Sequence, residues 1–248
     1  VPSAWDGRKI LLNFGAVDYT SSIDVNGELA GRHYGGSSSF SVDITRFVKA
    51  GETADVVVWV QDDIRSGTQA GGKQSLGYYS AGCNYTRVTG IWQTVWMEFV
   101  PKNYIRYAKI TPFVQDGRAM VDIEAVGGRA VKAVAYFDGC AVSEASAKVA
   151  GGNASVILEI PEPHLWDVGV PNLYDLTLTL DGEDTVQSYF GMRSVEVKDG
   201  FLYLNGKCVF QRLILDQGFY PDGIYTASCE DELLNDIKRS MACGFDGA

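Results

Sequence analysis

Apolar and polar residues alternate along most of this chain, which is the pattern of strands with one buried face. Nearly every such segment is short, and turn-forming residues follow it. In the first hundred positions the pattern predicts strands over residues 10–14, 19–25, 40–44, 56–60 and 91–100. The amino-terminal part is therefore predicted to be a β domain.

Two local signals refine this domain. Asn26-Gly27 predicts a hairpin, because both central positions of a type I′ turn need a positive φ. Residues 56–60 read Val-Val-Val-Trp-Val. A continuous apolar run of this length predicts a strand that is covered on both faces.

Residues 61–87 form a long segment rich in turn residues, with five glycines and with Tyr78, Tyr79 and Tyr85 among them. Irregular stretches this long are uncommon inside compact domains and are often functional. A surface excursion without a role is the alternative, and the residues alone do not decide between the two.

A second β pattern begins at residue 104. Its segments are short, rich in β-branched and aromatic residues, and separated by Asp-Gly and Gly-Gly pairs. We predict strands over residues 104–113, 119–126, 130–137, 154–160, 173–180 and 184–190. This spacing is typical of an immunoglobulin-like sandwich, although the Cys…Trp…Cys signature of antibody domains is missing.

The last part of the chain changes character. Residues 209–215 predict a strand that runs into Asp216, and a helix follows with Ser228 as its N-cap and Gly244 at its end. Phe245 would begin another strand, so these residues form a βα unit, which implies a parallel sheet or barrel. One βα unit cannot close a barrel, so we expect this domain to be cut off after its first unit.

Charge and composition exclude several partners. The chain has 21 basic and 31 acidic residues, a net charge of −10, and no basic run. This argues against nucleic acid and anionic membranes as partners. No apolar run approaches the ~20 residues of a membrane-spanning helix, and no signal-peptide pattern opens the sequence. The compartment stays open.

No cofactor and no metal is predicted. The five cysteines are far apart and form no CxxC pair, so we expect free and mostly buried thiols. Neither a Walker A motif nor a GxGxxG after a strand is present. The acids at Asp62-Asp63 and in residues 181–184 lack the spacing of a calcium-binding EF-hand.

Candidate chemistry is sparse. Only His33 and His164 could act as the base of a hydrolase triad, no GxSxG motif accompanies them, and structural roles are favoured. Paired carboxylates for glycoside chemistry cannot be selected among 31 acids. Asp216 and Gln217 stand where the first strand of a parallel barrel would end, which is where such barrels carry their active sites. They could equally cap that strand.

Four motifs in fixed order carry a resemblance to a known family. They are Phe14-Gly15-Ala16-Val17-Asp18 with Val25-Asn26-Gly27, Thr89-Gly90-Ile91-Trp92-Gln93-Thr94-Val95, Leu165-Trp166 with Pro171-Asn172-Leu173-Tyr174, and Phe190-Gly191-Met192-Arg193 with Leu204-Asn205-Gly206-Lys207. With these motifs the chain resembles glycoside hydrolase family 2, the β-galactosidase and β-glucuronidase family.

The resemblance implies three domains. Residues 1–101 would be a galactose-binding-like jelly roll, clipped at its start. Residues 102–191 would be the immunoglobulin-like sandwich, and residues 192–248 the truncated first βα unit of a TIM barrel. The fold class is therefore expected to be mainly β.

The resemblance also implies a retaining exo-β-glycosidase that hydrolyses terminal β-linked sugars. Its catalytic glutamates would lie on later barrel strands, so no catalytic residue is assigned here. The substrate-binding candidates are Asn84 and Arg87 in the loop before residue 89, and Asp216 and Gln217 after the first barrel strand. The family's R-G-x-N-x-H run is matched here only at Arg212, so galactose specificity is not assumed.

Carbohydrate is accordingly the expected partner. Two alternatives remain open. The chain could be a carbohydrate-binding module that works without catalysis, or its β domains could serve mainly as contacts in a homo-oligomer.

Overall fold

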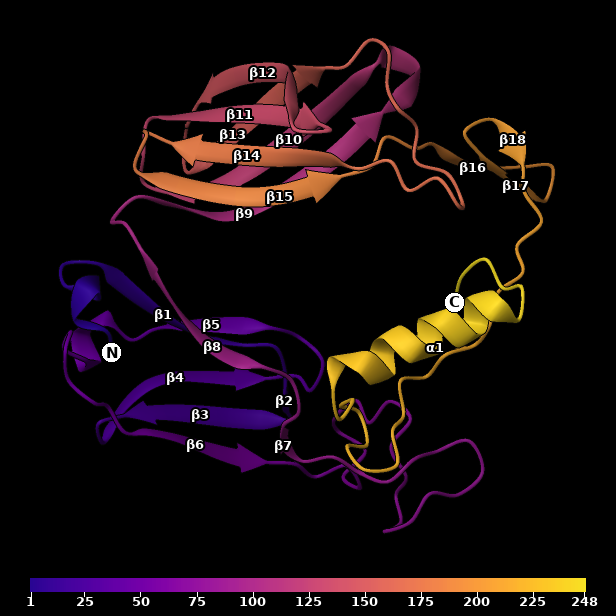
Figure 1. Ribbon diagram of the computed structural model, residues 1–248. Helices are drawn as coiled ribbons and strands as arrows, with labels where there is room; N and C mark the ends of the chain where they lie inside the picture. The colour runs from indigo at the N-terminus through magenta and orange to yellow at the C-terminus, as the bar shows by residue number, and fades with distance from the viewer. The chain divides into compact units, whose positions relative to one another are not determined.

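The computed structural model describes residues 1–248 (Figure 1). The chain is built mainly from antiparallel strands, which confirms the predicted mainly β fold class. It divides into two compact units, the first formed by Val1–Phe99 with Leu213–Ala248, and the second by Val100–Arg212. The domain boundaries near residues 101 and 191 stay a prediction.

Eight short strands form the amino-terminal part. They are β1 (Lys9–Phe14), β2 (Val17–Asp18), β3 (Thr20–Val25), β4 (Glu28–Tyr34), β5 (Phe40–Asp43), β6 (Val56–Gln61), β7 (Gly90–Ile91) and β8 (Val95–Val100). Single 3₁₀ turns lie at Ser3–Trp5 and Thr45–Phe47. The strands form two three-stranded sheets, β5-β1-β8 and β4-β3-β6, and a small β2-β7 pair.

One apolar core joins these sheets. β1 contributes Ile10, Leu12 and Phe14, and β3 contributes Ile23 and Val25, all of them buried. Because successive side chains of a strand point to opposite faces, the alternation in the sequence places these residues on one side of each sheet. The β domain that the pattern predicted is therefore present, and the jelly roll that the resemblance implies stays a prediction. The Asn26-Gly27 hairpin is confirmed, with φ of 51° and 82°.

Two expectations for this part are wrong in detail. β6 is not covered on both faces: its residues alternate between exposed and half-buried, and Trp59 is 64% exposed. The reason is that only one face of β6, with Val58 and Val60, packs against the core, and the other face is exposed. The strand expected over residues 91–100 is interrupted by residues 92–94, which leave the ladder between β7 and β8.

The second unit contains a seven-stranded sandwich. Its strands are β9 (Tyr104–Phe113), β10 (Arg118–Val126), β11 (Ala130–Phe137), β12 (Cys140–Lys148), β13 (Asn153–Glu159), β14 (Tyr174–Leu180) and β15 (Asp184–Phe190), with a 3₁₀ turn at Val114–Asp116. They form the sheets β13-β10-β9 and β12-β11-β14-β15. The six predicted strands are present, and β12 was missed because its small residues carry little β propensity.

Two of the sequence motifs meet inside this unit. Tyr174 is 1% exposed, and its hydroxyl accepts the backbone N–H of His164 at 2.7 Å. The backbone N–H of Trp166 donates to the carbonyl of Met192 at 2.9 Å, and the guanidinium carbon of Arg193 lies 4.7 Å from the centre of a Trp166 ring. These motif residues therefore hold the sandwich and the segment that follows it together.

The remainder consists of a small meander and one helix. The meander is β16 (Val195–Lys198), β17 (Phe201–Leu204) and β18 (Lys207–Cys208). The helix is α1 (Glu230–Ala242), whose end before Gly244 agrees with the sequence. Its N-cap is Cys229 and not Ser228; the carboxylate of Glu232 instead accepts the Ser228 backbone N–H at 2.9 Å.

The prediction of a strand over residues 209–215 is wrong, because the structure has no continuous strand there. Only Leu213 is paired, in one parallel bridge to Gly247, with the N–H of Ile214 donating to the Gly247 carbonyl at 3.0 Å. A strand needs a continuing ladder, and no further neighbour supplies one. Phe210 and Leu215 are accordingly more than four-fifths exposed, at 85% and 81%.

The prediction of free cysteines is confirmed, and the prediction that they are mostly buried is wrong. All five thiols are free, but all five are exposed instead of buried. Four of them lie at element ends, where side chains remain accessible: Cys140, Cys208, Cys229 and Cys243. None of the helices is long and apolar enough to cross a membrane.

Core truncation should be costly in the second unit. Leu178 on β14 is fully buried, so Leu178→Ala should lower the free energy of unfolding by about 2–5 kcal/mol through lost burial and cavity formation. Ile157→Ala on β13, where the side chain is 51% exposed, is the matched control and should cost much less. Urea unfolding measures both. Equal losses would contradict the assigned core.

Candidate functional site

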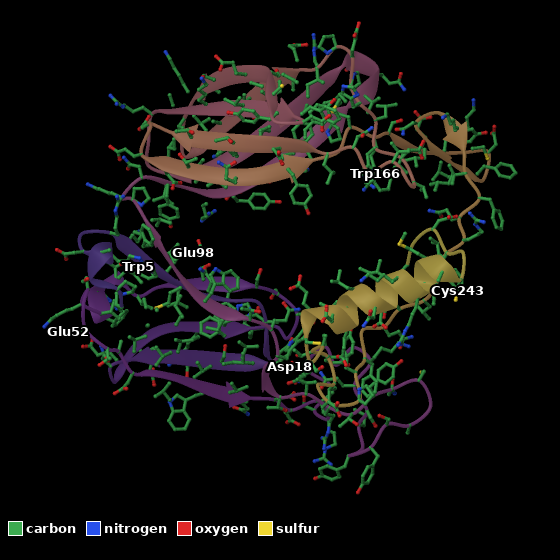
Figure 2. The ribbon with its side chains drawn as sticks, viewed as in Figure 1. Trp5, Asp18, Glu52, Glu98, Trp166 and Cys243 are labelled. Atoms are coloured by element: carbon green, nitrogen blue, oxygen red, sulfur yellow. The ribbon has the colours of Figure 1, made fainter.

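A cavity of about 740 Å³ lies in the first unit. Four stretches of the chain line it: the end of β2 with the next residue, the loop at 35–38, the loop at 70–74, and residues 217–225, with Trp92 between them. Figure 2 shows Asp18 at the end of the strands of this unit, where these loops gather. The cavity therefore belongs to a single compact unit.

Asp18 is the most unusual residue of the cavity. Its side chain is 4% exposed, and its Oδ2 accepts a hydrogen bond from the Gln74 amide nitrogen at 2.7 Å. Its Oδ1 is also buried, but no donor of the protein reaches it. A buried polar atom without a partner is costly, and in native proteins it often marks a functional site. Asp18 is also the acidic residue among those that line the cavity.

Local structure explains how an acid comes to lie here. Asp18 ends β2 and pairs with Gly90 of β7, so its backbone is fixed by the sheet. The backbone of Gly36 lies directly against the carboxylate, and a Cβ at this position would overlap Asp18 Oδ1. The indole N–H of Trp92 donates to the Gly36 carbonyl at 2.7 Å and holds that backbone in place.

The surroundings shift two pKa values. Burial raises the pKa of Asp18, the hydrogen bond from Gln74 partly opposes this rise, and the negative charge of Asp62 adds to it. Burial likewise raises the pKa of Tyr225, with further contributions from Asp18 and Tyr85. Tyr225 thus keeps its hydroxyl proton at neutral pH and can donate it in a hydrogen bond.

The segment 217–226 is tied to the loop 61–87 and to Trp92. The Tyr85 hydroxyl donates to Gln217 Oε1 at 2.6 Å, and the rings of Tyr85 and Phe219 stack at 4.3 Å. The Thr226 hydroxyl donates to the Trp92 carbonyl at 2.6 Å. Two regions that the sequence singled out separately therefore meet at one cavity.

The four predicted binding residues are placed differently from one another. Gln217 lines the cavity with Asp18. Asp216 lines an adjoining hollow of about 1,210 Å³, and its Oδ1 accepts the Gly218 N–H at 2.8 Å. Arg87 lies 4.7 Å from the Tyr78 ring centre beside a third hollow of about 340 Å³. Asn84 lines none of these three; its backbone pairs with Ala81.

Sequence reasoning missed Asp18, Gln74, Trp92 and Tyr225 as residues of one site. The available signal was an acid placed directly after the apolar residues that end at Val17. Its partner Gln74 follows 56 positions later. No local pattern encodes that contact.

The protonation of Asp18 provides a direct check. Its carboxyl should titrate above the ordinary value of 3.8, whereas Asp43, which Thr45 and Lys9 hydrogen-bond despite partial burial, should titrate below it. The folded state then holds the Asp18 proton more tightly than the unfolded chain, so this group's contribution to stability falls as pH rises through its pKa. Carboxyl ¹³C NMR measures both midpoints.

An Asp62→Asn variant extends this check. Because the Asp62 charge raises the pKa of Asp18, its removal should lower the Asp18 midpoint and leave that of Asp43 in place. An Asp18 midpoint below 3.8 in the wild type would contradict the described burial.

Comparison with known proteins places the chain. Residues 103–193 match the sequence profile described as glycosyl hydrolases family 2. A putative β-glucuronidase of Formosa agariphila is 34% identical over 81% of this chain, and a β-galactosidase of Thermoanaerobacter pseudethanolicus is 25% identical over 84%. The matched parts are 25% and 29% of those two proteins, so the chain spans about a quarter of their length.

Solved structures agree in fold. The β-glucuronidase of Faecalibacterium prausnitzii superposes with a TM-score of 0.75 and 26% identity, over 97% of this chain and 43% of that one. The β-D-glucuronidase of Dictyoglomus thermophilum gives a TM-score of 0.77 at 23% identity, over 99% and 44%. Sequence, profile and fold agree, and the chain belongs to glycoside hydrolase family 2.

Proposed function

We propose that this chain supplies the sugar-binding, non-catalytic side of a retaining exo-β-glycosidase that acts on terminal β-linked sugars. The observation that carries this is the buried carboxylate of Asp18, a residue that lines the cavity and whose Oδ1 has no donor from the protein. Sugars are dense in hydroxyl donors, and an ionised acceptor forms strong hydrogen bonds with them. The catalytic glutamates are expected outside residues 1–248.

The cavity has further groups suited to a sugar. Trp92 and Tyr225 present aromatic rings, whose faces suit the apolar C–H faces of a pyranose. The Tyr85 hydroxyl occupies Gln217 Oε1, which leaves the Gln217 amide nitrogen to donate. We propose Gln217 as a direct sugar contact, and Asp216, Asn84 and Arg87 as contacts from the adjoining loops.

The role of these residues is to bind and orient. Retaining glycosidases need two carboxyl groups about 5–5.5 Å apart, one as acid/base and one as nucleophile. Asp18 is held by Gln74 inside a loop-lined cavity, and we assign it a binding role and no proton transfer. The names of the relatives place β-glucuronides and β-galactosides first among the sugars to test.

One observation favours the alternative of a carbohydrate-binding module. Tyr78 and Tyr79 on the loop 61–87 are 73% and 83% exposed, and exposed aromatic faces stack on sugar rings. In that case the loop surface would bind the sugar and the cavity would not.

Binding by the 248-residue chain tests the proposal. Titration with methyl β-D-galactoside, methyl β-D-glucoside and methyl β-D-glucuronide should perturb the Trp92 indole signal in NMR spectra with at least one sugar. Asp18→Ala should weaken that binding by about 10-fold or more, since a hydrogen bond to a charged group contributes about 1.5–3 kcal/mol. Asp6→Ala, an exposed acid outside the cavity, should leave it unchanged.

The same samples distinguish the proposed function from catalysis by this chain and from the binding-module alternative. With nitrophenyl β-glycosides we expect no turnover by this chain, and turnover that an acid-to-amide change in residues 1–248 abolishes would contradict the non-catalytic role. Binding lost in Tyr79→Ala but retained in Asp18→Ala would favour the module alternative.

A further inference from the structure

Gln74 is a buried amide in the middle of a mostly exposed, glycine-rich loop. It is 8% exposed, and its neighbour Ser75 is 5% exposed. The side-chain nitrogen donates to Asp18 Oδ2 at 2.7 Å, and the side-chain oxygen accepts the Val88 N–H at 2.8 Å. Because a backbone N–H occupies the amide oxygen, the amide nitrogen is the group that must face Asp18.

The backbone around Gln74 is equally fixed. The Gln74 N–H donates to the Gly71 carbonyl at 3.1 Å, and the Ser75 N–H donates to the Tyr85 carbonyl at 2.7 Å. The Tyr85 N–H in turn donates to the Lys73 carbonyl at 2.8 Å. Gln74 is therefore held from both sides by the strand-like stretch at residue 85, and its side chain has little freedom to follow a moving carboxylate.

We propose that Gln74 is a positioning residue for sugar binding: its amide hydrogen-bonds Oδ2 of the Asp18 carboxyl and so reserves Oδ1 for a sugar hydroxyl. This inference rests on the proposed function. Asp18 has one donor from the protein, so this single hydrogen bond decides which oxygen is free. Without it, both oxygens would lack donors, and the carboxyl could turn or take up a proton.

The charged and titratable groups around Asp18 also bear on how its carboxyl is held. Asp62 acts on it as a like charge, Tyr225 lines the same cavity and interacts with its charge, and Lys73 is the cation among the lining residues. Asp62 is itself held, since its two oxygens accept Gln69 and Thr89. Gln69–Asp62 is thus a second glutamine–aspartate pair on the same loop, and it provides a matched control.

The test compares Gln74→Met with Gln69→Met in the 248-residue chain. Methionine keeps the length of the side chain and removes the amide. Without sugar, the carboxyl ¹³C midpoint of Asp18 should rise in Gln74→Met, because the hydrogen bond that lowers it is gone. In Gln69→Met the Asp18 midpoint should not rise, because the hydrogen bond from Gln74 to Asp18 is still in place.

Sugar affinity gives the second readout. At a pH above the wild-type Asp18 midpoint, Gln74→Met should bind the tightest of the three methyl glycosides about 10-fold more weakly, and Gln69→Met should bind it as the wild type does. The pH at which binding is half-maximal should move upward in Gln74→Met together with the Asp18 midpoint. A purely structural role would lower thermal stability without moving this profile.

Gln74→Glu supplies a second variant should the methionine variant fail to fold. It retains the side-chain shape and replaces the donor by a like charge, so it should raise the Asp18 midpoint further. An unchanged Asp18 midpoint in the folded Gln74 variants would overturn the proposal. If the wild type binds none of the sugars while the midpoint still rises, the proposed function fails and the fixing of the Asp18 carboxyl by Gln74 stands.

Discussion

The hydrogen bond between the Gln74 amide and the Asp18 carboxylate is the constraint on which the cavity of the first unit depends. Burying an ionised carboxylate is costly unless hydrogen bonds compensate for lost hydration. Here one oxygen is compensated and the other is not, and the raised pKa of Asp18 reflects that imbalance. A protein that needed only stability would do better with an apolar residue at this position, so the carboxylate points to ligand recognition.

The same hydrogen bond links chain segments that are far apart in sequence. Gln74 lies in the loop 61–87, which also carries Tyr85, and Tyr85 holds Gln217 and stacks on Phe219. A change at the segment near residue 217 can therefore reach Asp18 through a short series of packed groups. This explains why the carboxyl-terminal residues from Leu213 onward belong to the first unit, although the whole second unit separates them from it in sequence.

In the second unit the motif residues have a structural role. Its family motifs, around Trp166, Tyr174 and Arg193, are used for packing and backbone hydrogen bonds. They identify the family because the sandwich and the segment that follows it need them. Resemblance through such motifs therefore indicates the fold, and the choice of sugar depends on the residues of the cavity in the first unit.

The sequence predicted most strands because alternation reports burial directly, as in β1 and β3, and it predicted the Asn26-Gly27 turn because only a few residues accept a positive φ there. It failed where tertiary context decides. β6 has the composition of a strand covered on both faces but packs only one face against the core. Residues 209–215 have strand composition but only one bridge. Gln217 was predicted as a binding residue and lines the cavity, although the strand expected before it is reduced to one bridge. Asp18 and Gln74 depend on a contact across 56 positions, which no local pattern encodes.

The most direct measurement of the central claim is the Asp18 carboxyl midpoint with and without saturating sugar. A hydroxyl that donates to Oδ1 favours the ionised form, so the bound sugar should lower the pKa of Asp18. The account predicts a fall in the Asp18 midpoint on saturation, with the Asp43 midpoint unchanged. An Asp18 midpoint that is the same in the free and the sugar-saturated chain would contradict it.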